Sequence, residues 1–174
     1  LTLLNKAPIN GMRGCYLYTD YEDRFLFIAG YHDGKVTVMR LNDDGTIGEI
    51  ADEVYHKGLG TAAWRNFRPH VQCVKMTRDN RFLLACDLGL DRVNVYEINH
   101  QTGKLKGVDI IHADQESAPR HMQFSRDGRF LYLVHEQKRT VEVYSYTLDE
   151  SGVPEFERIQ SIPTTRDPGA MGVI

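Results

Sequence analysis

Three segments of this 174-residue chain repeat one pattern, and the repeat constrains the fold more than any other feature. They read DRFLFIAGYHDGKVTVMRL, NRFLLACDLGLDRVNVYEI and GRFLYLVHEQKRTVEVYSY. Each holds an Arg-Phe-Leu strand, a short polar turn and a second strand that alternates around Val. The arginines Arg24, Arg81 and Arg129 recur at intervals of roughly 50 residues. A repeat of this size made only of short strands is typical of a β-propeller.

Period-two alternation and Asx or Gly turns divide each repeat into four antiparallel strands. We expect these strands at 14–19, 25–29, 35–41 and 47–54, at 71–76, 81–86, 92–98 and 104–111, and at 122–124, 130–134, 141–146 and 156–162. No segment has convincing helical periodicity. The predicted class is therefore all-β, with four-stranded blades at about 13–54, 70–111 and 120–162.

Three blades are too few to close a ring, because propellers typically have about 4–8. The sequence therefore predicts a partial propeller domain over 1–174, a fragment of a longer polypeptide. Residues Leu1–Leu4 are expected to be the outer strand of a preceding blade, and 170–174 the start of a following one. The alternative is a complete, atypical small all-β protein, whose cut sheet edges would be left unpaired.

Composition limits the class of protein and the partners to expect. With 41% hydrophobic and 26% charged residues the chain is typical of a soluble globular protein, and its net charge of −3 gives no reason to expect nucleic acid. No apolar run approaches the roughly 18 residues that cross a bilayer, and no signal-like segment is present. The three cysteines lack metal-like or redox-like spacing, which indicates reduced, mostly buried thiols. We expect a cytoplasmic protein with no metal or cofactor and no membrane partner; the oligomeric state stays open.

Antiparallel blade geometry predicts where polar residues meet. The start of the first strand and the end of the second lie on one face of each blade, and the first strand lines the axis. We call that end of the axial channel the mouth. The residues expected there are Arg13, 31–33, Pro69, His70, 87–91, 119–121 and 136–139. The long connector 55–68, with Trp64, Arg65 and Arg68, reaches the same face and is a candidate lid or pocket wall.

Two segments that contribute residues to the mouth resemble those of a known family. PHVQCVKMTRDNRFLLACDLGLDRVNVYEI is similar to the signature blade of the seven-bladed lactonases, the propeller-type 6-phosphogluconolactonases, and APRHMQFSRDGRFLYLVHEQKRTVEVYSY is similar to their next blade. Fungal carboxy-muconate cyclases share that fold. The resemblance implies a seven-bladed ring about twice this length, and lactone chemistry at the mouth without an obligatory metal.

The family pattern carries over to His70, to Arg120 with His121, and to Glu136. Two departures are visible. Many relatives have a second histidine two residues after the first, where this chain has Gln72, and a further arginine of the family would lie beyond Ile174. We predict His70, Arg120 and Glu136 as catalytic, and His121, Arg68, Asp87 and Gln72 as substrate-binding.

Each of these residues also has a structural interpretation. Glu136 can act as a general base or acid, or simply pair with Arg120, which itself suits an oxyanion or a phosphate. His70 can be the base instead, or can be hydrogen-bonded within its blade. Asp87 and Asp91 bracket Leu88-Gly89-Leu90, and closing a tight turn is the favoured interpretation for both.

The leading functional hypothesis is hydrolysis of a sugar-derived anionic lactone, 6-phosphogluconolactone, in the pentose phosphate pathway. A muconate-type cycloisomerase would keep the site and change the reaction. A non-catalytic propeller that scaffolds protein partners is the third possibility, because the fold hosts many functions. The framework residues repeat while the mouth residues differ between blades, which favours one asymmetric ligand pocket.

Overall fold

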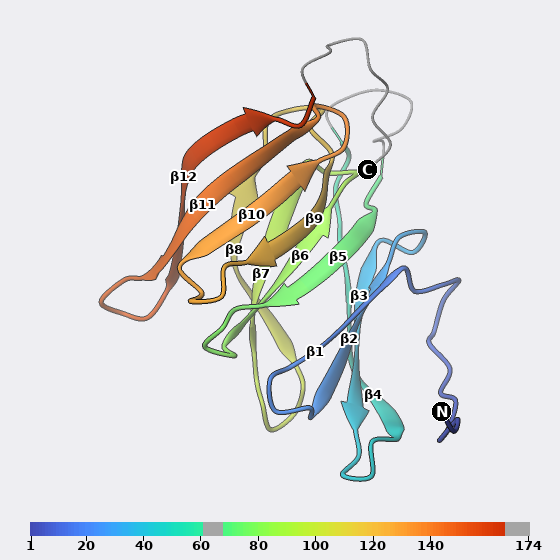
Figure 1. Ribbon diagram of the computed structural model, residues 1–174. Helices are drawn as coiled ribbons and strands as arrows, with labels where there is room; N and C mark the ends of the chain where they lie inside the picture. Colours follow the sequence, from blue (N-terminus) through green and yellow to red (C-terminus); the bar gives the residue numbers. More distant parts are fainter. Residues whose placement is uncertain (61–67, 166–174) are drawn as a thin grey trace.

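The computed structural model describes residues 1–60 and 68–165, which form three four-stranded antiparallel sheets and contain no helix (Figure 1). This confirms the predicted all-β blades. The first blade comprises β1 (Tyr16–Thr19), β2 (Phe25–Gly30), β3 (Lys35–Leu41) and β4 (Ile47–Tyr55). The second comprises β5 (Val71–Met76), β6 (Phe82–Asp87), β7 (Arg92–Ile98) and β8 (Leu105–His112). The third comprises β9 (Pro119–Phe124), β10 (Phe130–His135), β11 (Thr140–Leu148) and β12 (Pro154–Pro163).

Each blade is a meander in which strands pair with their neighbours in sequence. The first strands of the blades lie closest together, since β1 contacts β5 and β5 contacts β9. The sheets therefore follow one another as blades around a common inner side (Figure 1). The start of each first strand is thereby brought to one region.

The hydrophobic core lies between blades rather than within them. One buried cluster joins the first and second blades, through residues such as Phe27, Val36 and Leu83, and another joins the second and third, through Leu84 and Leu131. Successive side chains of a strand point to opposite faces, so β6 serves both clusters. Tyrosines at strand spacing also pack between blades: Tyr96, Tyr144 and Tyr146.

Two first strands carry a β-bulge near their start. On β5 the register shifts between Val71 and Cys73, so Gln72 has no direct partner. On β9, Pro119 pairs with His135 and His121 with Val134, which leaves Arg120 unpaired in the same way. A bulge bends the strand and redirects a side chain, and bulges often lie beside functional sites.

The N-terminal end of the chain differs from the expected outer strand. Leu1–Leu4 is not a strand: these residues are exposed and have no strand pairing. Residues 170–174 lie outside the described part of the chain. Within the described ranges, no helix is long and apolar enough to span a membrane.

Candidate active site

A pocket of about 410 Å³ opens where the first strands of the three blades begin. Its lining comes from two places in each blade, the start of the first strand and the residues just after the second. The first blade supplies Arg13, Gly14, Cys15, Tyr31 and His32, the second Gln72 and Leu88, and the third Arg120, Glu136 and Gln137. This is the convergence that antiparallel blade geometry predicts for the mouth.

Equivalent backbone positions supply the pocket. The register has matching strand pairs in the three blades, Tyr16–Ala29, Cys73–Cys86 and His121–Val134. The residue before the first member of each pair lines the pocket: Cys15, Gln72 and Arg120. So does the residue that follows each second strand: Tyr31, Leu88 and Glu136. The framework is thus repeated, while the chemistry placed on it differs in every blade.

Arg120 and Glu136 form the charged wall of the pocket. Arg120 Nη1 donates to Glu136 Oε2 at 2.5 Å, and each side chain is about one quarter exposed. The Glu136 backbone N–H donates to the Ala118 carbonyl at 2.9 Å, which fixes the start of the turn after β10. Arg120 Nε is buried and has no hydrogen-bond partner among the described residues. A buried donor without a partner is rare in proteins, so the Nε–H of Arg120 is available to donate a hydrogen bond to a ligand.

His70 lies just behind this pocket. It is only 5% exposed, and its ring stacks on that of Tyr31, with centroids 4.3 Å apart and planes at 14°. His70 Nδ1 lies 3.0 Å from the Tyr31 carbonyl oxygen. A carbonyl can only accept, so Nδ1 is the donor in this hydrogen bond, and the tautomer that it selects has the lone pair on Nε2. Tyr31 lines the pocket and His70 does not.

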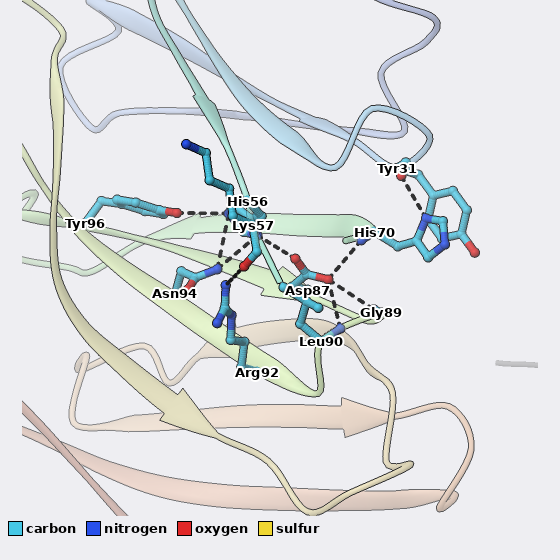
Figure 2. A network of polar contacts seen from close by, with 10 residues as sticks. All are labelled: Tyr31, His56, Lys57, His70, Asp87, Gly89, Leu90, Arg92, Asn94 and Tyr96. Atoms are coloured by element: carbon cyan, nitrogen blue, oxygen red, sulfur yellow. Dashed lines mark hydrogen bonds and ion pairs between the residues drawn. The ribbon is translucent and has the colours of Figure 1, made fainter. Parts of the chain in front are cut away.

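Asp87, predicted as substrate-binding, is not among the residues that line the pocket. It is fully buried, and Oδ1 accepts the backbone N–H groups of His70, Gly89 and Leu90 at 2.9, 3.1 and 3.1 Å (Figure 2). Oδ2 lies 2.6 Å from His56 Nδ1. Because its oxygens are taken up by these partners, Asp87 acts as the turn-closing residue that the alternative interpretation favoured.

The network continues from Asp87 to His56, which follows the last strand of the first blade, and from there to Tyr96 of the second blade. His56 is 8% exposed, and its Nε2 lies 2.9 Å from the hydroxyl of Tyr96 (Figure 2). Burial raises the pKa of Tyr96 to about 12, so the phenol is protonated and donates to Nε2. His56 Nδ1 then donates to Asp87. His56 has no distinctive spacing in the sequence, and sequence reasoning missed this role.

Asp91 fixes the third blade as Asp87 fixes the second. Its carboxylate accepts the backbone N–H groups of Glu116 and Ala118, both at 2.8 Å. Both of these residues have positive φ, 59° and 55°, a conformation that costs energy for a residue with a side chain. The Asp91 carboxylate thus holds the chain two residues before Arg120.

Cys15 is a pocket residue that sequence reasoning missed, because a lone cysteine carries no spacing signal. The residue is exposed, yet its Sγ lies 3.4 Å from the carbonyl oxygens of Ala29 and Val71. Desolvation raises the pKa of the Cys15 thiol. Cys73 and Cys86 are fully buried, and all three thiols are free.

No metal site is apparent in the part of the chain that the structure describes. Among residues 1–60 and 68–165, no three His, Cys, Asp or Glu side chains lie close enough to hold an ion.

The comparisons with known proteins agree with this geometry. The family model "Lactonase, 7-bladed beta-propeller" matches residues 1–172. The chain belongs to this lactonase family. It is 36% identical to an uncharacterized protein of Lactococcus lactis subsp. cremoris, over 99% of this chain and 49% of that protein. It is 28% identical to the 6-phosphogluconolactonase of Bacillus subtilis, over 94% of this chain and 46% of that protein.

Among solved structures, a putative 6-phosphogluconolactonase of Bacteroides fragilis superposes with a TM-score of 0.78 and 31% identity. The match covers 88% of this chain and 43% of that one. The chain spans about half the length of these curated relatives.

The sequence predicted seven site residues, four of them through the lactonase resemblance, and the structure does not bring all seven together. Arg120, Glu136 and Gln72 line one pocket, and His70 lies one ring behind it. His121 does not line the pocket: it is half-buried, with its ring centroid 6.1 Å from that of Tyr16, and burial lowers its pKa. Alternation along β9 explains this, because His121 follows Arg120.

Of the connector 55–68, the structure describes Arg68 but not Trp64 or Arg65, and Arg68 lies elsewhere than predicted. Arg68 is exposed and does not line the pocket. Its backbone carbonyl packs against Gly89, where an added Cβ would lie only 1.9 Å away, so glycine is required there. Trp64 and Arg65 fall in 61–67, outside the described residues.

Proposed function

We propose that this chain carries the active site of a hydrolase that opens an anionic sugar lactone, with 6-phosphogluconolactone as the substrate. The observation that carries the proposal is the Arg120–Glu136 pair on the wall of the pocket. Membership of the lactonase family and the name of the Bacillus subtilis relative support the same reaction class.

Lactone hydrolysis needs a base for water, a donor for the tetrahedral oxyanion and a proton for the leaving alkoxide. Glu136 takes a proton from the attacking water, whose oxygen forms the new bond to the carbonyl carbon. Arg120 donates to the oxyanion that develops on the carbonyl oxygen. When the ring C–O bond breaks, the protonated Glu136 returns its proton to the alkoxide, which yields a hydroxy acid.

Glu136 is better placed than His70 for this role, because it lines the pocket while His70 is covered by Tyr31. The Nε2 lone pair of His70 is suited to a second task. It can accept a hydrogen bond from a hydroxyl or water at the edge of the pocket, and so help to orient it. The Tyr31 carbonyl keeps the ring in the tautomer that this task requires.

The product of this reaction would be 6-phosphogluconate, an intermediate of the pentose phosphate pathway, and a cytoplasmic location follows from that assignment. The ligand is a small anion, and we infer no nucleic-acid or membrane partner. Both inferences rest on the proposed substrate.

The test is the rate at which the intact polypeptide removes 6-phosphogluconolactone, compared with spontaneous hydrolysis at the same pH. We expect a clear acceleration that disappears in the double variant Arg120→Ala/Glu136→Ala. A folded wild-type protein that gives no acceleration would overturn the proposal. In that case a muconolactone assay in the ultraviolet would test a cycloisomerase, and retention of protein partners by the double variant would favour a scaffold.

A further inference from the structure

We propose that Arg13 binds the anionic substituent of the lactone, a phosphate or a carboxylate remote from the reacting carbonyl, and so selects charged lactones over neutral ones. The inference rests on the proposed function and adds to it. It assigns separate tasks to the two arginines of the pocket, Arg120 at the reacting carbonyl and Arg13 at the substituent.

The first observation is the charge balance of the pocket. Arg13 and Arg120 both line it, and among the lining residues that the structure describes Glu136 is the only carboxylate. Arg120 is engaged by Glu136 at 2.5 Å. Within residues 1–60 and 68–165, no carboxylate lies within ion-pair distance of Arg13. The described lining therefore carries one guanidinium more than it has carboxylates, which suits a ligand with a permanent negative charge.

The second observation is that the backbone holds Arg13 in place. On one side, the Met12 N–H donates to Asp33 Oδ2 at 2.9 Å. On the other, the Cys15 N–H donates to the Ala29 carbonyl at 2.8 Å. Asp33 is thus held by the backbone beside Arg13 and makes no ion pair with the guanidinium. A side chain on a fixed backbone loses less conformational entropy on ligand binding than one on a mobile segment.

Close packing fixes the segment further. An added Cβ at Gly14 would lie 2.6 Å from Ile28 Cγ2, so the chain beside Arg13 approaches β2 as only glycine allows. This packing keeps the root of Arg13 at the rim of the pocket. The Arg120–Glu136 wall comes from the third blade, so the two guanidinium groups enter the pocket from different blades.

The chemistry of the ligand matches two separate cations. A phosphorylated lactone has a permanent anion at one end, while negative charge at the carbonyl appears only during the reaction. A guanidinium binds phosphate or carboxylate through parallel N–H donors, with specificity that a single ammonium lacks. Arg13 would therefore contribute to binding of the charged lactone, and Arg120 to the reaction itself.

The experiment compares 6-phosphogluconolactone with glucono-1,5-lactone, a neutral analogue, in wild-type protein and Arg13→Gln. We expect kcat/KM for the phosphorylated lactone to fall about ten- to hundredfold, as for the loss of a charged hydrogen bond, through an increase in KM. The value for the neutral lactone should change less than about twofold. Arg13→Lys should recover part of the loss. Arg129→Gln is the matched control, because it removes the same charge from an exposed turn away from the pocket.

Binding of the products gives a readout that does not need turnover. Calorimetry should show that 6-phosphogluconate binds more tightly than gluconate, and that Arg13→Gln abolishes the difference. An equal loss for both lactones, or no loss for either, would overturn the assignment of Arg13. If wild-type protein hydrolyses neither lactone but binds 6-phosphogluconate through Arg13, the proposed reaction falls and the anion site stands. If it binds neither product, the anion site falls as well.

Discussion

The ring of His70 lies flat against the ring of Tyr31, with 4.3 Å between centroids. Tyr31 follows β2 of the first blade and His70 precedes β5 of the second, so this contact crosses the boundary between blades. Tyr31 also forms part of the pocket wall. The position of a predicted catalytic residue therefore depends on a side chain from the neighbouring blade.

Replacing Tyr31 should separate the ring from its hydroxyl. Tyr31→Phe keeps the stack and the carbonyl that holds His70 Nδ1, so we expect kcat/KM for the lactone within about twofold of wild type. Tyr31→Ala removes the stack, and we expect a loss of about tenfold, on the scale of a misplaced acid–base group. Steady-state kinetics measure both. Equal activity of the alanine variant and the wild type would show that the stack has no part in the reaction.

Replacing Glu136 tests the base. Glu136→Gln can still accept a hydrogen bond from Arg120 but cannot take a proton, so we expect kcat to fall by about 10²–10⁴. Thermal melting should stay close to that of wild type. Gln137→Ala is the control, since Gln137 lines the same pocket without an ionisable group, and its kcat should change less than about threefold. A Glu136→Gln variant with wild-type turnover would remove Glu136 from the mechanism.

Asp87 should matter for stability more than any pocket residue. Asp87→Ala leaves three backbone N–H groups and His56 without their buried acceptor, and we expect a loss of about 3 kcal/mol in the free energy of unfolding. Urea denaturation measures it. Asp109→Ala, at an exposed strand position, should change stability by less than about 0.5 kcal/mol. If the two variants are equally stable, the network of Figure 2 does not hold the fold together.

His135 should make stability depend on pH. It is fully buried, and desolvation lowers its pKa despite Glu142 Oε2 at 3.2 Å. The unfolded chain, with a histidine pKa near 6.5, then binds more protons than the folded one as pH falls. Stability from this group is present above about pH 6.5 and decreases as the pH falls toward the folded pKa.

Melting temperatures at pH 7.5 and 5.0 test this. We expect the drop in wild type to be smaller in His135→Gln and unchanged in His112→Gln, which replaces an exposed histidine. The slope with pH is compared, so a general loss of stability in His135→Gln does not obscure the result. An identical slope in all three proteins would contradict the prediction.

Cys15 should react slowly although it lines the pocket. Desolvation raises its pKa, so little thiolate is present near neutral pH, and the thiolate is the reactive form. Iodoacetamide labelling followed by mass spectrometry should show slow modification at pH 7.5 that accelerates above about pH 9. The buried Cys73 and Cys86 should not react in folded protein. Rapid labelling of Cys15 at pH 7 would show that its sulfur is activated.

The sequence was sufficient to predict the blades, because strand alternation and repeat spacing reflect burial between neighbouring sheets. It also predicted that Arg120 and Glu136 meet, since meander connectivity alone brings the start of β9 beside the end of β10. Strand β9 itself begins at Pro119, earlier than the expected 122, because the bulge at Arg120 interrupts the alternation but not the pairing.

Other parts of the site depend on contacts that no local pattern encodes. The buried Asp87 is satisfied by three backbone N–H groups and by His56, which lies in the connector between the first and second blades. The Tyr31–His70 stack likewise joins residues of two repeats. Spacing within a repeat carries no information about such pairs.

The position before the first matching pair of each blade holds a thiol, an amide and a guanidinium in successive blades, at Cys15, Gln72 and Arg120, and in the second and third blades it lies in a β-bulge. The cores between the blades are built from other positions, so a new side chain can be tried here with little disturbance of folding. The same backbone position, repeated from blade to blade, can thus change its side chain in one blade while the paired framework of the other blades stays as it is.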